Sequence, residues 1–295
     1  MNTESKRMTS CLRVLAGAAL VALSVAVAHA QSKSGTLDKI KASGTISLGY
    51  RDNSTPFSFT EGGHEPIGYS IDLCREVVAG IRRQLKLDQI KINWVPVTIG
   101  DRIKMVVDGK VDLECGSTTN TLSRRAVVDF SLPTFIDGGS YIAKAATRVP
   151  SIKDLDGKRV GIIAGSSTEK AFAAAASRDF VKPAIVYVKD HDEGFRAVQD
   201  GKIDAYASDR MILFGLAVVA KVDQKDYFLS GELYSFEPYG LMMRRDPDFR
   251  LAVDTQLARL YRSGEIIKVV GKWFGGLGEP PELLKAMYIL NAYPE

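Results

Sequence analysis

Apolar residues recur along the chain with two alternating periods, one typical of strands and one typical of helices. Residues 46–50 alternate between apolar and polar side chains, as in a half-buried strand, and residues 90–94 repeat the pattern. Residues 71–85, which follow Gly68, place their apolar side chains on one helical face, and a second helix is expected over 102–107. This rhythm predicts an α/β fold with mostly parallel sheet flanked by helices.

An internal repeat predicts that the α/β unit occurs twice. Residues 106–112 are echoed by residues 197–204, and in each copy a helix ends at a glycine before a strand that starts with an apolar residue and an aspartate. Five residues after that aspartate comes a polar residue, Ser117 in the first copy and Asp209 in the second. The repeat therefore predicts two similar lobes.

The lobes are expected to meet where polar residues and glycines at 137–140 interrupt apolar sequence. A further apolar strand at 239–243 would carry the chain back to the first lobe. We therefore expect residues 31–137 to form the first part of lobe 1, 138–237 to form lobe 2, and 238–295 to complete lobe 1. Two such crossings would act as a hinge.

Residues 1–30 have the three-part pattern of a cleaved secretory signal peptide. Basic residues precede an apolar run at 15–27, and Ala28-His29-Ala30 offers small residues at the two positions that signal peptidase reads. The run is shorter than the roughly 20 apolar residues that span a bilayer. We therefore expect cleavage before Gln31 and a periplasmic mature protein.

The formal net charge of +4 includes the basic N-terminus, and the charges of the mature chain are dispersed. No nucleic-acid partner is therefore expected. The mature chain keeps Cys74 and Cys115, which an oxidising compartment would permit to pair. The sequence alone slightly favours two buried free thiols.

No arrangement of catalytic or metal-binding residues stands out. The P-loop and H-E-x-x-H motifs are absent, and His64 and His191 are not at metal-ligand spacing. Residues 161–165 lack the third glycine of a dinucleotide-binding motif. The sequence therefore predicts no cofactor, no metal and no catalytic residue, and it favours a binding protein over an enzyme.

Polar side chains gather at predicted strand ends and helix starts, where open α/β sheets bind ligands. The candidate ligand-binding residues are Arg51, Arg102, Ser117, Thr119, Arg124, Ser167, His191 and Asp209. Arginine binds carboxylates through two hydrogen bonds, a helix start offers free N–H groups, and an aspartate suits an ammonium group. Three arginines against one aspartate leave an excess of positive charge, which favours an amino acid with a second carboxylate.

Each candidate also has a purely structural alternative. An arginine after a strand is usually a solvated loop residue, and Ser166 to Thr168 could only cap a helix. His191 and Asp209 could cap the helices that follow them. Asp112 and Asp204, the aspartates of the repeat, are interpreted as structural.

A set of short motifs carries a resemblance to a known family. These are Thr36-Leu37-Asp38-Lys39-Ile40, Arg51 with Pro56-Phe57-Ser58, Gly68-Tyr69-Ser70, Glu114-Cys115-Gly116-Ser117-Thr118-Thr119-Asn120, Val128-Asp129-Phe130-Ser131, Lys189-Asp190-His191, Phe195-Arg196 and Lys272-Trp273-Phe274. From residue 36 to residue 274 the chain resembles the periplasmic amino-acid-binding proteins of bacterial ABC importers, and among them the glutamate/aspartate binders. The E-C-G-S-T-T-N run is the most specific motif.

The resemblance implies a type II Venus-flytrap fold with two hinge strands that closes on its ligand. It also implies a monomer that delivers glutamate or aspartate to an ABC permease in the inner membrane. By motif position, Arg124 with Ser117 and Thr119 would bind the α-carboxylate, and Asp209 would bind the α-ammonium.

The resemblance also assigns the other end of the ligand. Arg51, Arg102 and His191 would surround the side-chain carboxylate, and Ser167 would contribute from the second lobe. One departure is Ile99, where the close relative has a serine hydroxyl, so the resemblance leaves the preference between glutamate and aspartate open.

Two alternatives stay open. The protein could bind another polar amino acid. It could also be a secreted enzyme like cyclohexadienyl dehydratase, which shares this fold and needs a general acid in the cleft. Glu114 and His191 are the candidates for that acid.

Overall fold

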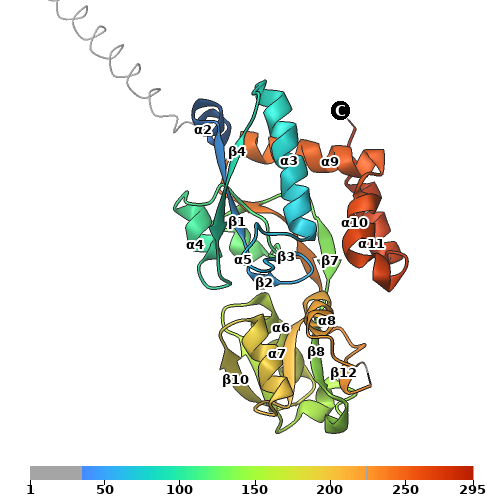
Figure 1. The fold of residues 1–295 in the computed structure, drawn as a ribbon. Helices are drawn as coiled ribbons and strands as arrows, with labels where there is room; N and C mark the ends of the chain where they lie inside the picture. Colours follow the sequence, from blue (N-terminus) through green and yellow to red (C-terminus); the bar gives the residue numbers. More distant parts are fainter. Residues whose placement is uncertain (1–34, 224, 295) are drawn as a thin grey trace, which may run out of the picture.

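The computed structural model describes residues 35–223 and 225–294, so the expected signal peptide at residues 1–30 lies outside the described residues (Figure 1). Two five-stranded sheets, one in each lobe, organise the fold (Figure 1). Among the described helices, none is both long and apolar enough to cross a membrane. The predicted two-lobed α/β arrangement is confirmed.

The first sheet has the strand order β4-β1-β5-β14-β6. Its strands are β1 (Thr45–Tyr50), β4 (Lys91–Pro96), β5 (Leu113–Glu114), β6 (Asp129–Phe130) and β14 (Met242–Met243). The short strands β2 (Asn53–Ser54) and β3 (Ser58–Phe59) form a ribbon beside it. The helices of this lobe are α2 (Thr36–Ser43), α3 (Tyr69–Leu85), α4 (Arg102–Val107), α5 (Leu122–Arg125), α9 (Pro247–Ser263), α10 (Ile266–Phe274) and α11 (Glu282–Leu290) (Figure 1).

The second sheet has the order β10-β9-β11-β8-β12. Its strands are β8 (Gly139–Lys144), β9 (Arg159–Ile163), β10 (Ala184–Val188), β11 (Ala205–Asp209) and β12 (Tyr227–Leu229), and its helices are α6 (Ser167–Arg178), α7 (His191–Gln199) and α8 (Arg210–Val219). In each sheet two strand pairs are parallel and two are antiparallel. Four of the five strands in each sheet therefore run in the same direction, as expected of a mostly parallel sheet. Only β8 and β14, which follow the crossings between the lobes, run against the others.

The internal repeat is real at the level of backbone geometry. Gly109 and Gly201 follow the ends of α4 and α7 with φ of 72° and 69°, a conformation that glycine adopts without strain. Asp112 then accepts the backbone N–H of Ser47 at 2.9 Å, and Asp204 accepts that of Arg159 at 2.8 Å. Each aspartate thus ties its strand to the neighbouring parallel strand, and both are structural, as interpreted.

Two short strands connect the lobes. β7 (Phe135–Asp137) pairs antiparallel with β13 (Glu237–Tyr239), and this pair belongs to neither large sheet. The single strand expected at 239–243 is therefore two strands, because Tyr239 pairs within the hinge and Met242 pairs within the first sheet. We propose lobe boundaries at 137/138 and 237/238.

An aromatic cluster packs where the hinge meets the first lobe. The ring of Phe57 lies 5.0 Å from that of Phe135, 5.1 Å from that of Tyr239 and 5.6 Å from that of Phe274. Tyr288 on α11 joins them through a 2.8 Å hydrogen bond between its hydroxyl and that of Tyr69. The C-terminal helices α10 and α11 therefore pack against the aromatic cluster that contains the hinge residues Phe135 and Tyr239.

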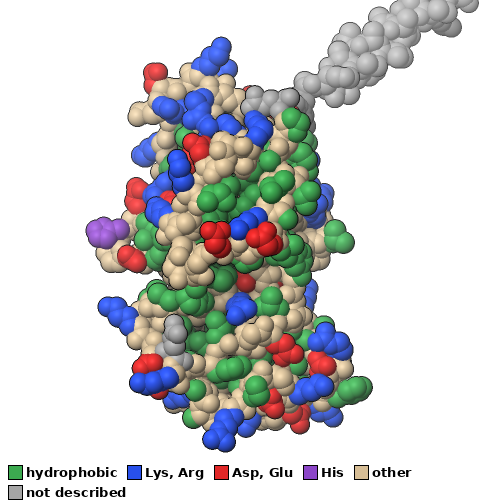
Figure 2. Space-filling view, turned by 90° about the vertical axis from the view of Figure 1, so that its right-hand side faces the viewer, with side chains coloured by type: hydrophobic (Ala, Val, Ile, Leu, Met, Phe, Trp, Pro, Cys, Tyr) green, Lys and Arg blue, Asp and Glu red, His purple; other side chains and the backbone are tan. Residues whose placement is uncertain are grey.

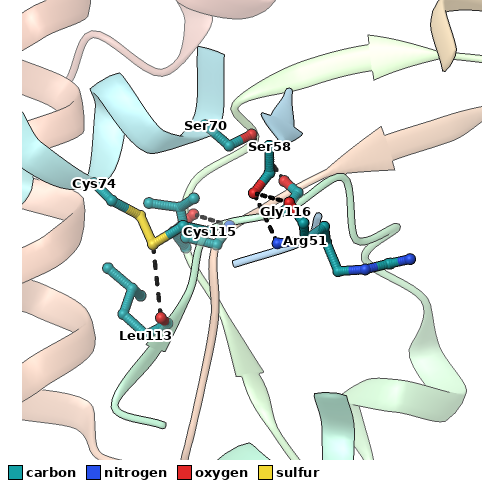
Figure 3. The surroundings of a disulfide bond; sticks show 9 residues. Arg51, Ser58, Ser70, Cys74, Leu113, Cys115 and Gly116 are labelled. Atoms are coloured by element: carbon teal, nitrogen blue, oxygen red, sulfur yellow. Dashed lines mark hydrogen bonds between the residues drawn. A yellow bond between two sulfur atoms is a disulfide. The ribbon is translucent and has the colours of Figure 1, made fainter. Parts of the chain in front are cut away.

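Cys74 and Cys115 form a disulfide, which corrects the slight preference for free thiols (Figure 3). Their Cα atoms lie 6.2 Å apart, and both residues are fully buried. The physical reason is that α3 packs over the end of β5, so that the two side chains point toward one another (Figure 3). The bridge therefore fixes the loop that carries Gly116 to Thr119.

Candidate ligand-binding site

The three predicted arginines are buried at the strand ends of the first lobe. Arg51 follows β1 and Arg102 opens α4, and each is 4% exposed; Arg124 lies in α5 and is 8% exposed. The alternative of solvated loop residues is therefore wrong. Burial and, second, the nearby charge of Arg102 lower the pKa of Arg51 and of Arg124 to about 10. The three guanidinium groups thus form one electrostatic cluster.

Most donors of these guanidinium groups have no protein acceptor. Within residues 35–223 and 225–294, the side chains of Arg51 and Arg102 make no hydrogen bond or ion pair, and the buried Nε of Arg102 has no partner. Arg124 donates one bond, from a guanidinium nitrogen to the carbonyl oxygen of Thr119 at 2.7 Å. A buried cation without hydrogen bonds is costly, so these side chains are suited to bind an anion.

The second lobe contributes residues from two helix starts and one strand end. Ser166 and Asp190 are the N-caps of α6 and α7, and their side chains accept the N–H groups of Glu169 and Glu193. The cap interpretation therefore holds for Ser166, but His191 is the first residue inside α7. Asp209 occupies the N-cap position of α8, yet its side chain makes no capping bond. Both His191 and Asp209 are thus free for other contacts.

His191 is a buried, neutral imidazole. Its Nδ1 lies 2.8 Å from the hydroxyl of Tyr206. Burial and, to a smaller extent, the charges of Arg51 and Arg102 lower the pKa of His191 to about 3. When Tyr206 donates to Nδ1, the ring proton sits on Nε2, where it can donate to an anion. Because the charges of Arg51 and Arg102 act on its pKa, His191 of the second lobe lies close to these two arginines of the first lobe.

Asp209 joins the second lobe to the hinge. One of its carboxylate oxygens accepts the hydroxyl of Thr168 at 3.0 Å, and the other accepts the hydroxyl of Tyr239 on β13. Burial and the charge of Glu237 raise the pKa of Asp209 to about 6, against the opposing effects of these two bonds and of Arg102. A carboxylate has about four acceptor sites, so Asp209 can still accept bonds from an ammonium group.

Thr119 and Ser167 meet across the cleft. Their hydroxyl oxygens lie 3.0 Å apart, although Thr119 belongs to the loop after β5 and Ser167 to the start of α6. Thr119 donates its own proton to Glu237 at 2.7 Å, so Ser167 is the donor between the two hydroxyls. Ser117 is half-buried on the same loop as Thr119. The structure therefore brings predicted residues from both lobes together.

Several buried groups of this cluster were not among the predicted ligand-binding residues, although Glu114 was a candidate acid in the enzyme alternative. Glu114 is 0% exposed, and neither of its carboxylate oxygens has a partner among the described residues. Glu237 is also buried, and Asp137 has a pKa raised to about 8 by burial and by the charge of Asp209. The expected excess of three arginines over one aspartate was therefore an incomplete count. Glu114 lies within a specific motif, but a carboxylate in a strand gives no sequence signal of its own burial.

A separate apolar cavity of about 390 Å³ lies behind the hinge and contains none of the eight predicted residues. It is lined by residues of the hinge, α8 and the C-terminal segment, including Phe135, Phe214, Phe236, Phe274 and Leu284. Figure 2 shows apolar side chains at the waist between the two lobes on this side of the molecule. Because this lining is mostly apolar, the charged cluster in front of the hinge is the better candidate for a polar ligand.

Known proteins resemble this chain over most of its length. It is 39% identical to an L-glutamate/L-aspartate-binding protein of Pseudomonas aeruginosa over 88% of this chain and 87% of that protein. It is 31% identical to a glutamate/aspartate import solute-binding protein of Escherichia coli K12 over 88% and 86%. These relatives match the chain over most of both lengths, which supports a common fold.

Solved structures give the same picture. An ancestral arginine-binding protein bound to arginine has a TM-score of 0.69 at 27% identity and covers 79% of this chain and 99% of that structure. An ancestral amino-acid-binding protein described as a precursor of cyclohexadienyl dehydratase has a TM-score of 0.69 at 27% identity, covering 82% and 100%. Residues 46–276 match the family described as bacterial extracellular solute-binding proteins, family 3. With its two lobes, its paired hinge strands and the charged residues gathered between the lobes, the chain belongs to this family.

Proposed function

We propose that the protein is the solute-binding component of an ABC importer, which captures glutamate or aspartate in its cleft and delivers it to a permease in the inner membrane. Three relatives named for glutamate and aspartate, from Pseudomonas aeruginosa, Salmonella typhimurium and Escherichia coli, are 39%, 33% and 31% identical to it. The protein would act as a periplasmic monomer after its signal peptide is removed.

One observation carries the proposal. Two buried arginines, Arg51 and Arg102, have no protein acceptor for their side chains among the described residues, and a third, Arg124, has one. Paired donors on planar guanidinium groups match the geometry of carboxylates. A ligand with two carboxylates would engage both the Arg124 side and the Arg51–Arg102 side of the cluster.

The ligand's two ends would bind different parts of the cleft. Arg124, with Ser117 and Thr119 on the neighbouring loop, would bind the α-carboxylate, and Asp209 would accept the α-ammonium. The hydroxyl proton of Thr119 is directed at Glu237, so Thr119 would have to redirect it to contact the ligand.

The side-chain carboxylate would lie at the opposite end of the cleft. Arg51, Arg102 and the Nε2–H of neutral His191 would donate to it. Ser167 would complete the site from α6, because its hydroxyl already reaches Thr119 across the cleft. Closure of the lobes would therefore bring donors from both sides onto one ligand.

A thermal-shift screen of the twenty amino acids tests the proposal, because a ligand that binds the folded state raises the melting temperature by mass action. Glutamate and aspartate should give the largest shifts, and calorimetry should then give their dissociation constants. Absence of heat with both, together with strong binding of arginine or glutamine, would contradict the acidic assignment.

The second candidate is an enzyme of the cyclohexadienyl dehydratase type. The likeness to an ancestral precursor of that enzyme and the presence of buried Glu114 favour it. His191 argues against it as a general acid, because its pKa of about 3 leaves it without a second proton near neutral pH. Incubation with prephenate or arogenate, followed by detection of aromatic product, distinguishes the enzyme from a binding protein.

A further inference from the structure

Glu114 is a buried carboxylate that none of the proposed ligand contacts uses. It ends β5 and is 0% exposed, with both oxygens unpartnered among the described residues. Its position is tightly defined, because a Cβ added to Gly116 would lie 2.3 Å from its Oε1 and 3.2 Å from the Cγ of Arg51. The carboxylate and the stem of Arg51 therefore pack over the same glycine.

The charge of Glu114 acts on all three arginines of the cluster. Its negative charge raises the pKa of Arg51, Arg102 and Arg124, and among the charged groups it has the largest effect on Arg102. Three buried cations at one sheet end repel one another, and desolvation adds to that cost. A carboxylate that packs beside the stem of Arg51 offsets this repulsion without forming a hydrogen bond to any of the three.

We propose that Glu114 is the built-in counter-charge of the cleft, which stabilises the three arginines in the ligand-free protein and, by repelling the ligand's negative charge, sets how tightly acidic ligands bind. The proposal rests on the proposed function for its second half. Its first half concerns the ligand-free protein alone.

The two halves of the proposal predict effects of opposite sign for one substitution: a less stable ligand-free protein and tighter binding of an acidic ligand. In Glu114→Gln, the amide keeps the shape of the side chain but removes its charge. The arginines then lose their counter-charge, so the ligand-free protein should melt at a lower temperature. Glutamate, which carries a net negative charge, should bind more tightly. A fold-change on the order of ten is expected for a unit charge about 10 Å from the ligand at an effective dielectric constant of about 20.

Selectivity gives a second measurement. Glutamine has no net charge, so its dissociation constant should change much less than that of glutamate, and the preference for glutamate should rise in Glu114→Gln. The control is Glu65→Gln, because the Glu65 side chain is 73% exposed and pairs with Arg75 away from the cleft arginines. This control should melt and bind as the wild-type protein does.

Sulfate gives a third measurement that needs no amino acid. An anion in the cleft should replace the lost counter-charge, so sulfate should raise the melting temperature of Glu114→Gln more than that of the wild type at matched ionic strength. If the variant fails to fold in low salt, refolding in sulfate should recover it. Failure to refold there would count against the counter-charge.

Three results would overturn the proposal. One is a ligand-free melting temperature equal to or above that of the wild type. Another is weaker glutamate binding, which would make Glu114 a ligand contact or a positioning residue. The third is an equal response of variant and wild type to sulfate. If the wild type binds no acidic amino acid, the proposed function fails, while the ligand-free melting temperature and the sulfate response still decide the role of Glu114.

Discussion

The hydroxyl of Tyr239 on hinge strand β13 donates to the carboxylate of Asp209 at the end of β11, and it also lies 3.3 Å from Asp137 on hinge strand β7. A residue of the hinge therefore contacts the proposed ammonium-binding group directly. Any movement of β13 relative to the second lobe must break or stretch this contact. The hinge and the binding site are thus coupled through one side chain.

Tyr239→Phe should weaken ligand binding in a pH-dependent way. The Tyr239 bond lowers the pKa of Asp209, so its loss should raise that pKa further above about 6 and leave less carboxylate at neutral pH. The ring keeps its packing against Phe57. Calorimetry should show a larger loss of glutamate affinity at pH 6 than at pH 8. Equal losses at both values would mean that the bond does not control the ionisation of Asp209.

Arg124→Ala should lower the affinity for glutamate by about 2–5 kcal/mol, because it removes one partner of a desolvated charge pair. Arg125→Ala is the matched control, since the neighbouring side chain is exposed and its Nε donates to Asn120. Calorimetry on both variants should separate them by at least about tenfold in dissociation constant. An unchanged constant for Arg124→Ala would remove this residue from the site.

Asp137→Asn should flatten the pH dependence of stability. The pKa of Asp137 is raised to about 8, whereas an unfolded aspartate titrates near pH 4. The folded protein therefore binds the extra proton between these values, and the stability contributed by this group is lost as the pH rises from about 4 through about 8. Asparagine has no such titration, so the variant should gain stability relative to wild type across that window.

Urea unfolding at pH 5, 7 and 9 measures this effect. The transition midpoint of wild type should fall more steeply with pH than that of Asp137→Asn. Asp209, with a pKa raised to about 6, adds to the slope in both proteins below that pH. Parallel midpoints in the two proteins would show that Asp137 does not hold its proton.

Removal of the disulfide should destabilise the protein by about 2–4 kcal/mol, since the bridge closes a loop between residues 41 positions apart. Cys74→Ala with Cys115→Ala leaves no reactive thiol at either position. Urea unfolding should show the loss, and glutamate affinity should fall as well, because the loop from Gly116 to Thr119 is anchored by Cys115. Full affinity in the double variant would show that the loop holds its shape without the bridge.

The sequence predicted the elements that depend on local pattern. The helical face after Gly68 and the echo around Asp112 and Asp204 were both confirmed, because periodicity and glycine caps act over a few residues. The split at Gly240 was not foreseen. There the chain passes from the hinge pair to the first sheet, and strand partners distant in sequence decide where each strand ends.

The same distinction applies to the site. Arginines after strands were found by the strand-end rule, and the structure places them in one buried cluster. Glu237 and Asp137 were not predicted, and Glu114 was named only as a candidate acid in the enzyme alternative, because nothing local distinguishes a buried carboxylate from a solvated one. Their importance comes from which charges they face, and those neighbours are set by the packing of the two lobes. For the same reason the Cys74–Cys115 pairing needed the position of α3 over β5.

The place of β14 in the first sheet has a consequence for the order in which the chain can fold. This strand lies between β5 and the edge strand β6, so β6 has no partner in the first sheet until residues 242–243 are available. The second sheet draws all its strands from the continuous stretch 139–229. During vectorial emergence of the chain, the lobe that presents Ser167, His191 and Asp209 can therefore be completed first. The lobe with the arginines closes last, and the charged cleft is assembled only when nearly the whole chain is present.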